Sequence, residues 1–489
     1  MRKAVLLISA AALTLAPAAV GAQYAVRGLD PRLAAQAQRE HPQVVEEYGG
    51  AETGPRAAYV DSVGRRVAAQ SGIANAPAAY HFTLLNSAVD NAFSVPGGYI
   101  YLTRQLLTIM NDESQLAFAL GHETAHVAAG HAQARQQVAR HNSIGGILGS
   151  ILGSVLGGGF GSAIAQMSER NAQLRTLSFS RDQEYQADTL GMRYMIAAGY
   201  DPAGAAGILA QLTLNTALQA RVQGRDNRTL PEWASTHPLS QNRMQRAAQE
   251  ARATGRLGTG IRNRDQFLDH LDGIFVDDDP AQGIIDGRTF THPDLKIQFT
   301  VPVGYLMQNS TRAVSISGSA GKSQFGGGGY RGSLDQYIYA VLRELAGNRQ
   351  LRTPPPQRTT INGIPAAYTV TRANTSNGVV DVSVVAYQWA PGTIYHFVML
   401  TRGGAGFGPF GSMINSIRKI SPAEAAAIRP RVIDVVTVRR GDTAQSLASR
   451  MAYRSFRLER FLALNGLAAN ARLAPGQKVK LVVYGARRS

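Results

Sequence analysis

The chain has 489 residues, of which 44% are hydrophobic, so it is not intrinsically disordered and is long enough for several domains. It contains no cysteine, which excludes disulfides, thiolate metal ligands and the attachment of a lipid to a cysteine. Its formal net charge of +17 favours anionic partners, but no motif for binding nucleic acid accompanies the scattered arginines.

The N-terminus has the pattern of a secretory signal peptide. Met1-Arg2-Lys3 is followed by an apolar stretch at residues 4–20, and Val20-Gly21-Ala22 places small residues before a cleavage point at Gln23. We therefore expect residues 1–22 to be a signal peptide. Export without disulfides is typical of a bacterial periplasm, so we expect a periplasmic protein that is not a lipoprotein.

The next stretch predicts two helices and two short strands. Residues 31–47 and 54–69 are expected to form helices that pack around a central helix, and residues 80–85 and 99–102 have the β-branched and aromatic composition of strands. If the second strand lies at a sheet edge, it can bind an extended peptide by β-augmentation; a buried strand is the alternative. The candidate substrate-binding residues around it are Asn91, Pro96, Gly97, Gly98 and Tyr99.

A helix beginning after Asp112 carries the pattern H-E-x-x-H, with His122, Glu123 and His126. Residues at positions i and i+4 of a helix are neighbours, so both imidazoles can reach one tetrahedral zinc ion. Glu123 then lies beside the metal without binding it, in the position of a general base. The alternative is a histidine pair on a polar helix surface.

A third ligand is predicted in a second helix, at residues 182–198. His131 is one residue out of register with the third histidine of the extended zinc motif, whereas Glu184 can complete a His-His-Glu set. Asp188 follows one turn later on the same face, where its carboxylate can accept a hydrogen bond from a ligating imidazole.

Between these two helices, residues 144–168 contain a glycine every fourth position. A stretch of this kind allows close helix approach but favours neither an isolated helix in water nor a typical membrane span. We expect a flap or hairpin over the site, in contact with a membrane or an unfolded protein; a membrane span is the alternative. The repeated glycines are Gly145, Gly149, Gly153, Gly157 and Gly161.

Four blocks occur together: residues 91–102, the H-E-x-x-H motif, the E-x-x-A-D motif that begins at Glu184, and residues 235–243. In this order they resemble the M48 family of zinc metallopeptidases across about residues 55–255. The resemblance implies a mainly α, gluzincin-type peptidase domain at residues 23–276, with a small edge sheet and one zinc ion per chain.

The same resemblance implies roles for two residues of the last block. His237 is expected to donate a hydrogen bond to the developing oxyanion, or to bind the zinc temporarily and hold the site closed, and Arg243 to stabilise the same charge. A capping threonine followed by a surface histidine is the alternative.

After an acidic run at residues 277–279, the pattern changes. Residues 283–421 are expected to form an α+β or mainly β domain, with strands near 296–301, 379–386 and 393–400 and one strong helix at 334–345. A glycine-rich loop is expected at residues 326–332. No catalytic motif is found in this domain.

A linker is expected at residues 422–432, followed by a module at residues 433–484 that resembles LysM. The resemblance rests on Gly441-Asp442-Thr443, Leu464-Asn465-Gly466-Leu467 and Pro475-Gly476-Gln477. It implies a βααβ fold that binds N-acetylglucosamine glycans, here peptidoglycan. The Arg-rich stretch at residues 451–460 favours the alternative, a module that packs against or binds protein.

Together these features predict a zinc-dependent endopeptidase of the bacterial envelope that degrades misfolded or misassembled envelope proteins, associated with the cell wall or a membrane. One alternative is a latent or non-enzymatic scaffold or holdase that binds peptidoglycan or unfolded protein. Another is a peptidase that cleaves peptidoglycan.

Overall fold

The computed structural model describes residues 28–134, 179–222, 237, 241–346, 353–375 and 378–485. The predicted signal peptide and the glycine repeat at residues 144–168 lie outside the described residues. Within the described ranges, no helix has the length and hydropathy needed to cross a membrane.

A three-stranded sheet organises the N-terminal domain, with strand order β1-β3-β2. β3 lies in the middle, parallel to β1 and antiparallel to β2. The condition for peptide binding along residues 99–102, that this strand lies at a sheet edge, is therefore not met, and the alternative of a buried strand is the correct one. The strands are β1 (His81–Leu85), β2 (Ala92–Val95) and β3 (Tyr99–Thr103).

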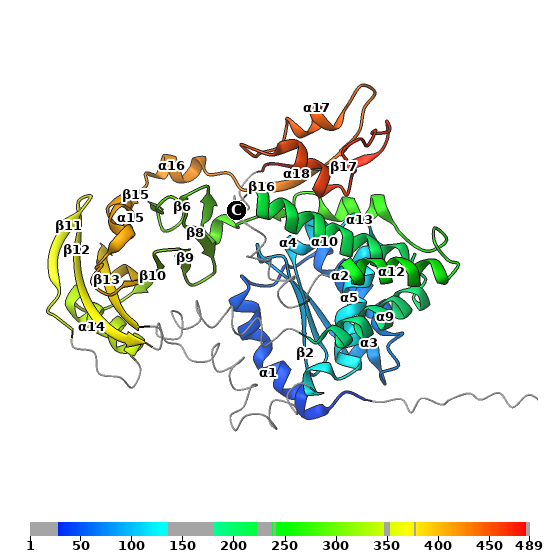
Figure 1. The fold of residues 1–489 in the computed structure, drawn as a ribbon, viewed down its shortest axis with the longest axis horizontal. Coiled ribbons are helices and arrows are strands. Elements are labelled where there is room, and N and C mark those ends of the chain that lie inside the picture. Colours follow the sequence, from blue (N-terminus) through cyan, green and yellow to red (C-terminus); the bar gives the residue numbers. More distant parts are fainter. Residues whose placement is uncertain are drawn as a thin grey trace, which may run out of the picture.

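The sequence of β3 explains its central place. Ile100 and Leu102 pack into the main core, whereas Tyr99 and Tyr101 pack into a second cluster with Ala37 of α1. A strand that is apolar on both faces is buried on both faces. Helix α1 thus covers one face of the sheet and α5 the other, so the prediction that α1 packs around the central helix is wrong (Figure 1).

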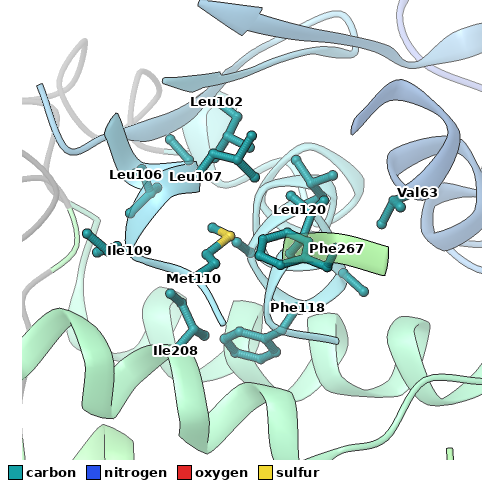
Figure 2. Packing of buried hydrophobic residues seen from close by; sticks show 14 of the residues in the cluster. Val63, Leu102, Leu106, Leu107, Ile109, Met110, Phe118, Leu120, Ile208 and Phe267 are labelled. Atoms are coloured by element: carbon teal, nitrogen blue, oxygen red, sulfur yellow. The ribbon is translucent and has the colours of Figure 1, made fainter. Parts of the chain in front are cut away.

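Helix α5 is the centre of the domain, since all its residues from Glu113 to Val127 are buried. α2, α9 and α10 pack around it. Figure 2 shows its residues Phe118 and Leu120 among side chains of the neighbouring elements. The helices are α1 (Pro31–Glu47), α2 (Pro55–Ala68), α3 (Ala76–Ala79), α4 (Arg104–Ile109), α5 (Glu113–Ala128), α9 (Arg181–Ala197), α10 (Ala203–Val222), α12 (Gln241–Ala253) and α13 (Arg264–Leu271).

Residues 284–419 form a separate three-layer domain. Its seven-stranded sheet has the order β11-β12-β13-β14-β10-β9-β8 and its four-stranded sheet the order β15-β7-β6-β5. One core lies between the two sheets, and a second lies between the larger sheet and α14 (Leu334–Ala346). The α+β prediction and its single long helix therefore agree with the structure.

The bounds of these strands are β5 (Ile284–Asp286), β6 (Thr289–His292), β7 (Ile297–Thr300), β8 (Leu306–Asn309), β9 (Val314–Gly318), β10 (Gly321–Gly329), β11 (Gln357–Ile361), β12 (Ile364–Thr375), β13 (Gly378–Ala390), β14 (Thr393–Arg402) and β15 (Arg418–Lys419). A short helix, α15 (Gly411–Ser416), precedes β15. The glycine-rich loop predicted at residues 326–332 is wrong in its first half, because Gly326 to Gly329 continue β10 and pair with β14. Glycine is needed there, since a Cβ on Gly327 would meet the Ile394 carbonyl.

The C-terminal module has the predicted βααβ order, but it is not independent of the N-terminal domain. Its sheet gains a third strand, β4 (Phe275–Val276), which pairs with β16. Ile433, Phe461 and Leu481 belong to the same buried cluster as α5. The elements are β16 (Arg431–Thr437), α17 (Ala444–Ala448), α18 (Arg457–Leu464) and β17 (Lys478–Tyr484).

The stretch predicted as a linker, residues 422–432, contains a short helix, α16 (Pro422–Ala427), and the start of β16. A reciprocal capping box between Ser421 and Glu424 explains the helix. β4 and β16 pair although residues 284–419 lie between them in the sequence, so this domain is an insertion between two paired strands.

Candidate metal centre

Helix α5 brings His122 and His126 together as its pattern predicts. The Asp112 carboxylate accepts a hydrogen bond from the backbone N–H of Gln115 at 3.1 Å, which caps the helix. The Nε2 atoms of the two imidazoles are 3.0 Å apart, and both rings are buried. This geometry directs both nitrogens to one point.

Helix α9 supplies the predicted third group. Glu184 Oε1 lies 3.5 Å from His126 Nε2, and its Oε2 lies 3.6 Å from His122 Nε2. α5 and α9 approach closely at Gly121 and Gly191, where a Cβ on Gly191 would lie 2.8 Å from the His122 backbone nitrogen. The two glycines thus set the separation of the helices that carry the three groups.

His237 adds a fourth group from outside the two helices. Its Nδ1 lies 3.0 Å from Glu184 Oε1 and 3.3 Å from His122 Nε2. One ligand atom from each of His122, His126, Glu184 and His237 lies within 4.8 Å of the others, and all four residues are buried. Three imidazole nitrogens and a carboxylate oxygen form a donor set that suits zinc.

The charges of this cluster fit a cation. Burial, followed by the neighbouring His122 and His237, holds the pKa of His126 well below its ordinary value, so this imidazole is neutral, which is the form that binds metal. Burial alone would lower the pKa of His237, but the carboxylates of Glu184 and Glu123 raise it overall.

Asp188 and Arg243 support the cluster. Asp188 Oδ1 lies 3.0 Å from His122 Nδ1, as predicted for a residue that orients the ring. The Arg243 guanidinium donates to both Asp188 oxygens at 2.8 and 2.7 Å and lies 2.7 Å from Glu184 Oε2. Burial alone would raise the pKa of Asp188, but the hydrogen bonds from Arg243 and His122 lower it to about 2. These contacts support an orienting role for Arg243; its predicted role on the oxyanion stays a prediction.

Glu123 lies between two partners. Its Oε1 is 3.3 Å from His237 Nε2, and its Oε2 accepts a hydrogen bond from Ser94 Oγ at 2.9 Å. Sequence reasoning missed Ser94, although it lies inside the block that resembles the M48 family. It also treated His131 only as a failed ligand, whereas the His131 Nδ1 lies 2.9 Å from the His126 Nδ1.

The other residues predicted to bind substrate make contacts within the fold. The backbone of Asn91 exchanges hydrogen bonds with Thr103, and a Cβ on Gly97 or Gly98 would clash with backbone of α1 or of α3. Tyr99 packs against His81 with ring centroids 4.4 Å apart. A contact of these residues or of Pro96 with substrate stays a prediction.

Family models match two parts of the chain: peptidase family M48 at residues 55–251 and the LysM domain at residues 436–482. The beta-barrel assembly-enhancing protease of Yersinia pestis is 32% identical over 196 residues, which is 40% of this chain and 38% of that protein. The mitochondrial metalloendopeptidase OMA1 of Schizosaccharomyces pombe is 29% identical over 214 residues, 43% of this chain and 58% of that protein.

Among solved structures, cyanobacterial PsbP from Synechocystis aligns with 28% of this chain and 98% of the PsbP chain. The identity is 11% and the TM-score is 0.23, so this likeness supports no inference. The match to the Yersinia pestis protease spans well under half of that protein's length. The cluster of His122, His126, Glu184 and His237 lies inside residues 55–251, the part that matches peptidase family M48. The chain therefore contains a peptidase family M48 domain, followed after an insertion by a LysM domain.

Proposed function

We propose that the chain is a zinc-dependent endopeptidase of the cell envelope that cleaves unfolded or misassembled envelope proteins. The observation that carries this proposal is the convergence of His122, His126 and Glu184 beside the carboxylate of Glu123. Three protein ligands with a carboxylate next to them are the arrangement of a hydrolytic zinc site.

Zinc, when held by these three residues, supplies Lewis acidity toward a peptide carbonyl and activation of water. The chain supplies the proton transfers. Glu123 Oε1 faces the cluster, so it accepts the proton of the attacking water and returns it to the leaving amine. Asp188 and Arg243 hold His122 and Glu184 in place.

The substrate is proposed to bind along β2 rather than β3. Among the described residues β2 pairs with β3 alone, which makes it an edge strand, and it packs against α5. A peptide added to this edge would pair through its backbone and run past Glu123, so we expect the enzyme to accept many unfolded sequences.

The proposed location and the proposed substrates are supported by the predicted signal peptide, by the LysM domain and by relatives named as beta-barrel assembly-enhancing proteases. Peptidoglycan is the proposed ligand of the LysM domain. Proteins of the envelope that fail to fold or assemble are the proposed substrates.

The experiment is cleavage of unfolded casein by the chain lacking residues 1–22, beside Glu123→Gln, with the zinc content of both measured. We expect about one zinc in each and cleavage by the wild type only. Loss of zinc from Glu123→Gln would contradict the role of Glu123 as a base that does not bind the metal.

A latent form of this enzyme is favoured by one observation: His237 already lies among the ligands, 3.0 Å from Glu184 and 3.3 Å from Glu123. A histidine held there occupies space that water and substrate need. We expect His237→Ala to keep its zinc and to cleave casein faster than the wild type. A fall in cleavage with zinc retained would instead support hydrogen bonding to the oxyanion.

A further inference from the structure

Ser94 lies on the edge strand β2 with its side chain toward the catalytic helix. Side chains alternate along a strand. Phe93 and Val95 pack with the cluster on the α1 side, whereas Ala92 belongs to the core around α5. The alternation places Ser94 on the α5 side, and its Oγ lies 2.9 Å from Glu123 Oε2.

The hydrogen bond has one direction. An ionised carboxylate only accepts, so the Ser94 hydroxyl donates. Glu123 is fully buried, and a bond from a hydroxyl to a buried carboxylate is stronger than one between neutral groups. With Oε2 held by Ser94, Oε1 is the oxygen that faces His237 and the ligand cluster.

We propose that Ser94 is a positioning residue, which fixes the Glu123 carboxylate so that Oε1 is presented to the water and to the leaving amine. This inference rests on the proposed peptidase function and deepens it. Ser94 also lies on the strand proposed to pair with substrate, so the bound peptide and the general base are held by the same four-residue strand. The hydroxyl thereby couples the register of the substrate to the orientation of the base.

The test compares Ser94→Ala, Ser94→Thr and Ser94→Val with the wild type. kcat and KM are measured on a fluorogenic unfolded peptide, with zinc content and Tm for each variant. We expect Ser94→Ala to lower kcat about tenfold, with KM, zinc content and Tm unchanged, because a misoriented base slows proton transfer. Ser94→Thr restores a hydroxyl and is expected to recover kcat to within about threefold of the wild type. Ser94→Val has the shape of threonine without the hydroxyl and is expected to stay slow.

Equal rates for Ser94→Thr and Ser94→Val, or a kcat of Ser94→Ala equal to that of the wild type, would overturn the inference. A wild type that binds zinc and cleaves nothing would instead overturn the proposed function, and this inference with it.

Discussion

The LysM domain and the inserted domain both lie outside the peptidase region in sequence, yet they relate to it differently. Residues of the LysM domain, among them Phe461 and Leu481, belong to the buried cluster that surrounds α5. The insertion, residues 284–419, has two cores of its own. Figure 1 shows the insertion extending to one side, whereas the LysM domain lies over α13 and α10. A domain that is separate in the sequence, such as the LysM domain, can thus share one hydrophobic core with the domain beside it.

The contacts across the LysM junction are buried and specific. Lys480 of β17 is fully buried, and its Nζ donates to the carbonyls of Thr108 and Met110 at 2.7 and 2.5 Å. These carbonyls lie just before α5, the helix that carries His122. The LysM domain therefore supports the segment that leads into the metal-binding helix.

The largest effect is expected from removing the LysM domain by a stop codon after Pro430. This change exposes the core that Ile433, Phe461 and Leu481 help to fill, and each such side chain contributes about 1.5–3 kcal/mol by burial. The sum approaches the whole stability of a domain, about 5–15 kcal/mol. We expect the truncated chain to lose cooperative thermal unfolding and zinc binding, as measured by circular dichroism and zinc content. A truncated chain with the Tm of the full one would show that the packing is not shared.

A smaller loss is expected from Lys480→Met. Methionine keeps the aliphatic stem but leaves the two carbonyls without their donor, at a cost of about 2 kcal/mol in the free energy of unfolding. Urea denaturation measures it. Lys478→Met on the same strand is the matched control, because its ion pair with Asp269 is partly exposed and is worth about 0.5 kcal/mol. Equal effects at the two positions would argue against the buried junction.

Sequence motifs predicted that His122, His126 and Glu184 lie together, because the residues on each helix follow a helical rule. The i and i+4 spacing of His122 and His126 requires only a helix, and α9 places Glu184 and Asp188 on one face in the same way. His237 followed from a family resemblance, since no spacing relates it to the other residues.

The order of strands could not be predicted, because pairing partners far apart in sequence leave no local signal. Whether β3 is an edge or a buried strand was left open, although residues 99–102 are hydrophobic at every position, which is the pattern of a strand buried on both faces. Ser94 was missed for a related reason: its contact with Glu123 depends on β2 being the edge beside α5. The shared core of the LysM domain was also invisible, since apolar residues of a module do not show which surface they meet.

A modest, pH-dependent effect is expected from Asp278→Asn, in the segment between β4 and the insertion. The half-buried Asp278 carboxylate accepts a hydrogen bond from the backbone of Ile285 at 2.8 Å, and burial raises its pKa from 3.8 to about 6. Between these values the folded chain holds more protons than the unfolded chain, so stability falls as pH rises through this window.

Asparagine removes this titration. We therefore expect Asp278→Asn to raise the free energy of unfolding by about 1 kcal/mol relative to the wild type at pH 7.5 and to leave it unchanged at pH 4. The size of the pKa shift limits the gain to about 3 kcal/mol. Urea denaturation at the two pH values measures the difference. Asp294→Asn changes an exposed carboxyl of the insertion and serves as the control. A gain for Asp278→Asn that is the same at both pH values would contradict the assignment.

The smallest effect is expected from excising residues 283–421 and joining the ends by a short Gly-Ser linker. The strands on either side of the insertion, β4 and β16, pair through Val276 and Arg431, so the linker joins two segments that lead to neighbouring strands. The insertion contacts the remainder mainly through exposed polar pairs, such as Arg312 with Glu46 and Arg454 with Asp286, each worth about 0–1 kcal/mol. The shortened chain should keep its zinc, a Tm within a few degrees of the full chain and casein cleavage within about twofold. The comparison would be reversed if the chain lost its zinc when the insertion is excised and kept it when the LysM domain is removed. The insertion would then support the candidate metal centre, and the LysM domain would be the separable part.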